Sequence, residues 1–259
     1  MTRNFWRPTC NSQLLTRNSQ LVTCHSHMIL AINTSTLQFS LALLSERGAI
    51  VAEHLMSEGK GHFGNLMPTL HFLLNSSGRE IREVKCISVA IGPGSFTGLR
   101  IGLSLSKGLC QALRVPIVGI STLEAMAVQA PCAGLPIVPI LHSRKGEVFT
   151  ARFIWENERG LKRAGEDTWV RFDDAPLLFQ EPSLFVGNDY PTQGTRLKDL
   201  LGERALLAPI HCWCLRASAV GSLALERFLQ GDLDDPCALN PVYLRPPDIR
   251  PNPSLKLRV

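Results

Sequence analysis

The chain has 259 residues and a mass of 28.5 kDa, and 45% of its residues are hydrophobic while 19% are charged. This much apolar material can form one large or two small hydrophobic cores, which excludes a disordered or fibrous protein. Gly, Ser or Pro interrupts every long apolar stretch, so none approaches the 18 residues that a membrane span requires. The formal charge is +5, but residues 1–27 hold three arginines and no acid. The remainder, with 24 basic and 22 acidic residues, is too close to neutral for a general nucleic-acid surface.

Residues 1–27 differ from the rest of the chain. They are rich in Ser, Thr, Asn and Arg, show no periodicity and lack the apolar core of a secretory signal. At Met28 an apolar run begins that is typical of a buried strand. We therefore predict that residues 1–27 are a disordered extension or that translation starts at Met28, and a transit peptide is the alternative interpretation.

The spacing of apolar residues after Met28 predicts three strands followed by alternating helices and strands. The predicted strands are 28–33, 38–44, 49–55, 84–91, 116–120 and 136–142, and the predicted helices are 63–75, 97–113 and 121–130. This order indicates an α/β fold whose sheet begins as a meander and continues with parallel strands. It is the order of the ribonuclease-H-like unit that actin and sugar kinases share.

The second half of the chain repeats this pattern less regularly. Its predicted elements are strands near 147–155 and 167–172, short elements near 184–187 and 205–208, and a helix at 216–230. We therefore predict two ribonuclease-H-like subdomains, residues 28–133 and residues 134–245, of which the second is a degenerate copy. Four prolines fall within residues 246–259, where we predict a loose tail.

A glycine-rich segment joins the strand 84–91 to the helix that follows. Gly92 and Gly94 permit a tight turn, and Ser95 or Thr97 can cap the helix. A helix entered through glycines suits an anion, but the segment is neither a Walker A loop nor a dinucleotide fingerprint, so a purely structural turn is favoured.

Asn33 and Ser35 end the first strand, where actin-like kinases keep an acidic residue. An Asn serves neither as a general base nor as a strong Mg²⁺ ligand. A vestigial nucleotide-binding loop would consist of Asn33, Ser35, Gly92, Gly94 and Ser95.

Two helices carry a pattern typical of close packing. Gly94, Gly98, Gly102 and Ser106 recur every four residues, so they form a ridge of small residues that something must approach closely. The approaching element is either the chain's own sheet or a helix of another chain. The preceding helix is apolar on more of its circumference than one buried face requires, which indicates either an oligomer interface or a fully buried helix. The predicted partner interface comprises His62, Leu66, Leu70, Gly98, Gly102 and Ser106.

The candidate nucleophiles and ligands do not form a reactive constellation. The eight cysteines contain no CxxC pair and are predicted to be reduced and buried. His62 and His71 lie nine residues apart without a carboxylate pair, and no serine stands in a nucleophile elbow. We therefore predict no catalytic residue, no metal site and no cofactor of the chain's own.

Five segments together resemble the TsaB (YeaZ) family, in the same order and spacing. They are residues 29–36, 92–102, 118–124, 144–149 and 241–245. The string Gly-Pro-Gly-Ser-Phe-Thr-Gly at 92–98 is highly specific to this family. The resemblance covers nearly all of residues 28–245, but the family usually has Asp at Asn33 and Asp-Ala-Arg at residues 142–144.

The resemblance implies an actin-like fold and a non-catalytic scaffold in the cytoplasm. Such a subunit binds a TsaD-type catalytic paralogue and, with a TsaE-type ATPase, supports threonylcarbamoyl transfer to the adenosine 3′ of the anticodon in tRNA. It implies pairing through residues 62–75 and 97–113, a self-dimer when alone, contact with tRNA only through the complex, and ATP or ADP only at the joint surface. The alternatives are an independent actin-like hydrolase or glycoprotease-type peptidase and, less favoured, tRNA binding by the chain alone.

Overall fold

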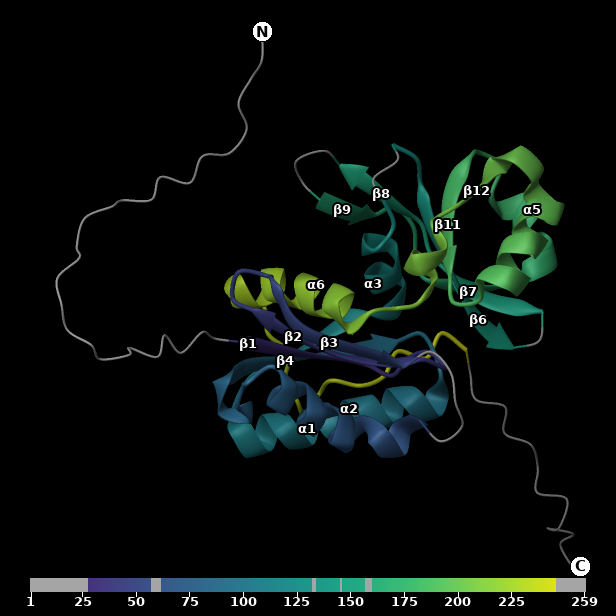
Figure 1. The fold of residues 1–259 in the computed structure, drawn as a ribbon. Helices are drawn as coiled ribbons and strands as arrows, with labels where there is room; N and C mark the ends of the chain where they lie inside the picture. Colours follow the sequence, from purple (N-terminus) through teal and green to yellow (C-terminus); the bar gives the residue numbers. More distant parts are fainter. Residues whose placement is uncertain (1–27, 57–61, 132–133, 145, 157–159, 246–259) are drawn as a thin grey trace, which may run out of the picture.

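The computed structural model describes residues 28–245 except 57–61, 132–133, 145 and 157–159 (Figure 1). The predicted extension at 1–27 and the predicted tail at 246–259 lie outside the described residues. Two β-sheets, each with its own helices, make up the described part (Figure 1). None of the helices in this part is both long and apolar enough to span a bilayer.

The first sheet has five strands in the order β3-β2-β1-β4-β5. The first three form an antiparallel meander, whereas β4 runs parallel to β1 and β5 runs parallel to β4. Their bounds are Met28–Asn33 (β1), Phe39–Ser45 (β2), Ile50–Met56 (β3), Val84–Gly92 (β4) and Ile117–Ser121 (β5). The predicted mixed sheet is confirmed.

Helices cover both faces of this sheet. On one face lie α1 (Leu66–Ser76), which a 3₁₀ turn at His62–Asn65 precedes, and α2 (Phe96–Leu113); α3 (Thr122–Val128) and α6 (Ala217–Leu229) lie on the other (Figure 1). Because both faces are covered, every residue of β1 is buried and the strand is a continuous apolar run up to its last residue.

The second sheet repeats the pairing order of the first. Its main path is β10-β7-β6-β11-β12, in which β6, β7 and β10 are antiparallel and β11 and β12 continue parallel to β6. The strands are Ile137–Arg144 (β6), Glu147–Thr150 (β7), Thr168–Arg171 (β10), Ser183–Gly187 (β11) and Ala205–Leu207 (β12). The chain therefore consists of two ribonuclease-H-like units, which is the arrangement of actin-like proteins.

The second unit contains elements that the sequence pattern did not predict. The predicted strand at 147–155 is two strands, because the chain leaves β7 after Thr150 and begins β8 at Phe153. The further elements are β8 (Phe153–Glu156), β9 (Gly160–Arg163), α4 (Ala175–Leu178) and α5 (Thr195–Leu201). The hairpin of β8 and β9 pairs with β6 at one position beside the main path of the sheet.

The C-terminal part of the chain joins the two units. Helix α6, which the pattern placed in the second half, packs on the first sheet, where a Cβ on Gly221 would lie 2.4 Å from the Leu44 side chain (Figure 1). The chain then follows the edge strand β5, and the Asp234 amide donates to the Ile117 carbonyl at 3.0 Å. This contact covers an edge that would otherwise expose unpaired backbone groups. Residues 234–245, which we call the C-terminal segment, end between the two sheets.

Candidate functional site

The predicted loop after β1 is held by the side chain of Asn33. Its Oδ1 accepts hydrogen bonds from the Ser35 amide at 3.0 Å and from the Ser35 hydroxyl at 2.7 Å. Its Nδ2 donates to Ser40 Oγ at 3.3 Å and to the Leu215 carbonyl at 3.1 Å. The buried amide therefore ties the end of β1 to β2 and to the residues that precede α6.

The glycine-rich segment after β4 packs tightly against this loop. Gly92 has a φ of +124°, and a Cβ there would lie 2.6 Å from the Val242 carbonyl oxygen. A Cβ on Gly94 would lie 2.2 Å from the Ser35 carbonyl oxygen. Both positions therefore require glycine. Ser95 Oγ accepts from the Gly98 amide at 3.3 Å, which confirms that Ser95 caps α2.

All five residues of the predicted nucleotide loop lie together, but they bond mainly to one another. The Ser95 amide donates to the Ser35 carbonyl at 2.7 Å, the Ser35 amide donates to Asn33, and the Gly98 amide donates to the cap. A phosphate cradle needs amides that point at the ligand, whereas the amides of Ser35, Ser95 and Gly98 donate within the chain. The geometry favours the structural turn.

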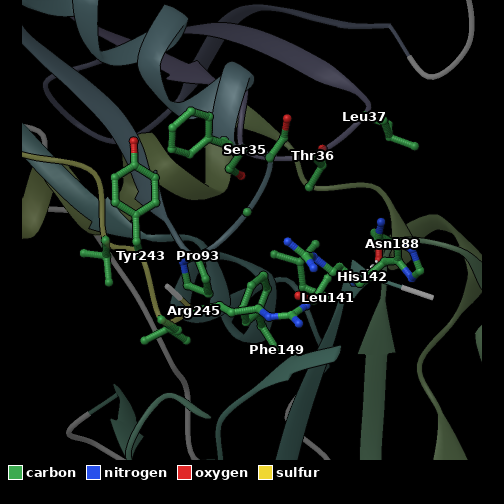
Figure 2. Close-up of a pocket in the computed structure, with 17 residues that line it drawn as sticks. Ser35, Thr36, Leu37, Pro93, Leu141, His142, Phe149, Asn188, Tyr243 and Arg245 are labelled. Atoms are coloured by element: carbon green, nitrogen blue, oxygen red, sulfur yellow. Dashed lines mark hydrogen bonds between the residues drawn. The ribbon is translucent and has the colours of Figure 1, made fainter. Parts of the chain in front are cut away.

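A cavity of about 530 Å³ opens beside this turn, between the two sheets. Figure 2 shows Ser35 and Thr36 on one side of the opening and Phe149 and Arg245 on the other. Its full lining is Ser35, Thr36, Leu37, Pro93, Gly94, Ser95, Phe96, Leu141, His142, Ser143, Arg144, Phe149, Asn188, Val242, Tyr243, Leu244 and Arg245. This set includes an imidazole and two guanidinium groups but no carboxylate. The cavity therefore suits a ligand with aromatic or apolar parts, because the charge of Arg245 in its wall is balanced by Glu147.

Sequence reasoning missed several residues of this cavity. Asn188, which follows β11, accepts from the His142 amide at 3.1 Å and so joins two neighbouring strands of the second sheet. Tyr243 and Arg245 belonged to a recognised motif, but that motif was not assigned to a site. Arg245 pairs with Glu147 at 2.7 Å, which fixes the C-terminal segment to β7. A second hollow of about 820 Å³ adjoins the first and shares His142 and Asn188 with it.

The ridge of small residues on α2 faces its own chain, so the prediction that it lies at a partner interface is wrong. Gly98, Gly102 and Ser106 are buried. Thr34 Oγ1 donates to the Gly98 carbonyl at 2.8 Å, and a Cβ on Gly102 would lie 2.1 Å from Thr34 Oγ1. Ser106 Oγ donates to the Gly102 carbonyl at 2.8 Å. The close approach is that of Thr34, at the end of β1.

The leucines predicted for the interface also face inward. Leu66 and Leu70 are buried in the core between α1, α2 and the sheet, so their assignment to a partner surface is corrected. The apolar excess of α1 lies instead on Met67 and Phe72, which are 53% and 61% exposed. His62 begins the 3₁₀ turn before α1, and its side chain lies outside the described part of the structure.

Comparison with known proteins assigns the family. Over 220 residues the chain is 33% identical to the tRNA threonylcarbamoyladenosine biosynthesis protein TsaB of Bacillus subtilis, covering 84% of this chain and 93% of the relative. It is 32% identical over 223 residues to TsaB of Escherichia coli, covering 84% and 94%. The chain belongs to the TsaB family. The solved structure of YeaZ from Pseudomonas aeruginosa superposes with a TM-score of 0.68 at 26% identity, covering 84% of this chain and 100% of that chain.

A second family is related to part of the chain. Residues 50–175 match the model of TsaD, the tRNA N6-adenosine threonylcarbamoyltransferase. The matched residues span α1 and α2 as well as the first strands of the second sheet. This part of the chain is therefore similar in sequence to a family of tRNA N6-adenosine threonylcarbamoyltransferases.

Asn33 and residues 142–143, which differ from the residues that the family resemblance implies, lie at the cavity between the two sheets. Asn33 supports the loop that borders the cavity, and residues 142–144 line the cavity. The substituted side chains are an amide and an imidazole in place of carboxylates.

The candidate reactive side chains have structural roles. Ser95 and Ser121 both cap helices, since Ser121 Oγ accepts from the Glu124 amide at 3.4 Å. Burial raises the pKa of the Cys86 thiol to about 12 and that of the Cys110 thiol to about 11, so both stay protonated at neutral pH. Among the residues that the structure describes, no group of three or more His, Cys, Asp or Glu is arranged to hold a metal ion.

Proposed function

We propose that this chain is a non-catalytic subunit in the synthesis of threonylcarbamoyladenosine on tRNA, and that it pairs with a TsaD-type catalytic subunit and works with a TsaE-type ATPase. The observation that carries the proposal is the exposure of two large apolar side chains, Met67 and Phe72, which lie at the two edges of the outward side of α1. A partner helix that packs on this side would remove both side chains from water.

The outward face of α2 extends this surface. Ser104, Gly108 and Ala112 are exposed and recur every four residues, and a Cβ on Gly108 would meet nothing within 4 Å. Small side chains let a partner helix approach closely. The match of residues 50–175 to the TsaD family supports a paralogous partner with equivalent helices, which would pack in a pseudo-symmetric arrangement.

The chemistry of the described residues supports a role without catalysis by this chain. Ser95 and Ser121 cap helices, and the thiols of Cys86 and Cys110 are buried and protonated. An activated nucleophile requires an adjacent base or a lowered pKa, and these groups have the opposite properties.

Light scattering after size-exclusion chromatography tests the proposal. The full chain, mixed with the TsaD-type protein of the same organism, is expected to elute at the mass of a heterodimer. Phe72→Ser is expected to abolish this peak, while the matched control Leu229→Ser, which changes a side chain 68% exposed on α6, retains it. Both variants are expected to unfold within about 2 °C of the wild type, because exposed substitutions change stability by roughly 0.5 kcal/mol or less.

Two results would contradict the proposal. If the wild-type chain does not co-elute with the TsaD-type protein, its similarity to the TsaB family does not extend to this pairing. ATP or peptide hydrolysis by the isolated chain, lost on a single polar substitution, would favour an independent hydrolase.

A further inference from the structure

An exposed cluster of three side chains stands at the mouth of the cavity. Phe96 is the first residue of α2, and the guanidinium carbon of Arg100 lies 3.8 Å from its ring centre. Arg100 Nε donates to the Tyr243 hydroxyl at 3.1 Å, and the rings of Phe96 and Tyr243 are 5.1 Å apart with an interplanar angle of 33°. We call Phe96, Arg100 and Tyr243 the aromatic platform. These contacts hold the two rings in fixed positions.

The aromatic platform is open to solvent although the C-terminal segment is anchored elsewhere. Phe96 and Tyr243 are 46% and 42% exposed. The segment is already fixed by the Val242 amide, which donates to the Ile91 carbonyl at 2.8 Å, and by the Arg245–Glu147 ion pair. The C-terminal segment is therefore held in place without the contacts that Phe96, Tyr243 and Arg100 make with one another.

The cavity that adjoins the platform combines aromatic and cationic side chains. Both rings belong to its lining, together with Arg245, which pairs with Glu147. In Figure 2 Tyr243 borders the cavity on one side and His142 on another. A ligand that occupies the mouth would therefore meet aromatic faces first and cationic groups behind them.

We propose that the aromatic platform and this cavity take one unpaired nucleotide of an RNA loop, an inference that rests on the proposed function. Unpaired bases stack on aromatic rings and on guanidinium planes, which is the chemistry of Phe96, Tyr243 and Arg100. A local contact of this kind is consistent with a chain whose overall charge is close to neutral.

The same chemistry would serve a free nucleotide, but the structure favours the RNA. The platform lies at the surface, where a strand can pass, and two amides of the glycine-rich turn beside it, those of Ser95 and Gly98, donate within the chain. A free nucleotide with several phosphates needs such amides for its binding. A single base and its phosphate within a longer strand do not.

Binding of a fluorescent tRNA anticodon stem-loop to the complex with the TsaD-type partner tests the inference. Tyr243→Leu and Phe96→Leu are each expected to weaken binding by about tenfold or more, because each removes a stacking ring. Tyr243→Phe keeps the ring and loses only the hydrogen bond to Arg100, so it is expected to bind within about twofold of the wild type. The salt dependence of these three variants is expected to match that of the wild type, because no charge is removed.

Three results would overturn the inference. One is wild-type affinity in both leucine variants within complexes of unchanged mass and unfolding midpoint. Another is equal affinity for a hairpin whose loop bases are paired. The third is competition by adenosine monophosphate at the concentration of the stem-loop, which would assign the site to a free nucleotide.

The design separates this inference from the proposed function. Light scattering on the same samples reports whether the wild-type chain pairs with its partner. If it does not pair, the proposed function fails, and the same variants are measured on the chain alone, where the same order of affinities is expected. A chain that pairs but shows no effect of the leucine substitutions overturns only the nucleotide site.

Discussion

Gly102→Ala tests whether the small-residue ridge of α2 packs within its own chain. The new Cβ would lie 2.1 Å from Thr34 Oγ1 and 3.3 Å from Thr34 Cβ, whereas an ordinary contact is 3.4–4 Å. Thr34 is fully buried, and its hydroxyl donates to the Gly98 carbonyl at 2.8 Å. The Thr34 side chain must therefore move, and this movement removes its hydrogen bond.

The expected cost follows from three contributions. Overpacking of a well-packed site costs about 1–3 kcal/mol. A buried hydroxyl without an acceptor costs about 1–3 kcal/mol more. Alanine in place of glycine within a helix returns about 1 kcal/mol. The free energy of unfolding is therefore expected to fall by about 1–5 kcal/mol, with about 3 kcal/mol as the central value.

Urea denaturation followed by circular dichroism measures this change. The matched control is Gly108→Ala in the same helix, where the added Cβ meets nothing within 4 Å, so this variant is expected to gain about 0.5–1 kcal/mol. Adding Thr34→Ala to Gly102→Ala removes the clashing oxygen and is expected to recover part of the loss. If Gly102→Ala is as stable as Gly108→Ala, the ridge does not pack against Thr34 and the reasoning is refuted.

The remaining predictions concern Asn33 and Cys86. Asn33→Asp replaces the amide that donates to Leu215 and Ser40 by a buried carboxylate. At pH 7 the free energy of unfolding is therefore expected to fall by about 2 kcal/mol or more, and at pH 5 it is expected to recover in part because the acid becomes protonated. Equal urea midpoints for variant and wild type would contradict this expectation. Because burial raises the pKa of the Cys86 thiol from 9.0 to about 12, its contribution to stability is complete below pH 9 and is lost as pH rises toward 12, at about 1.4 kcal/mol per pH unit. Cys86→Ala is therefore expected to flatten the decline of stability between pH 9 and 10.5, and parallel declines would show that this thiol is not protected.

The first sheet could be predicted closely because its sequence signals are strong. Each of its five strands begins and ends within one residue of the prediction. A strand that is buried on both faces, such as β1, is apolar throughout, and turn residues bound it on both sides. Periodicity and local turn chemistry therefore agree at these positions.

The second unit was predicted less well because its elements are short and partly exposed. Helix α4 has only 4 residues and α5 has 7, which is too few for a helical period to stand out. The predicted strand at 147–155 failed for a different reason. The break consists of Ala151 and Arg152 and contains no Gly or Pro, so no turn residue marks the point where β7 ends.

The position of the site was predictable from the sequence, but the face of α2 that is buried was not. Asn33 and Gly92 end neighbouring parallel strands, so the sequence order already placed their loops side by side. A four-residue spacing shows that Gly98, Gly102 and Ser106 share one face of a helix, but it does not show whether that face turns inward. The opposite face, with Ser104 and Gly108, carries a similar spacing, and only the packing of Thr34 decides between them.

Asn33 shows most clearly what a sequence can exclude and what only a structure can explain. Its identity already excluded a general base at the end of β1, because an amide neither takes up a proton nor binds Mg²⁺ strongly. Its donor group bonds to the Leu215 carbonyl, 182 residues away, just before the helix that returns to the first sheet. A carboxylate at this position cannot donate that bond. The residue that would serve phosphate chemistry in an actin-like kinase thus joins the end of β1 to the segment that precedes α6.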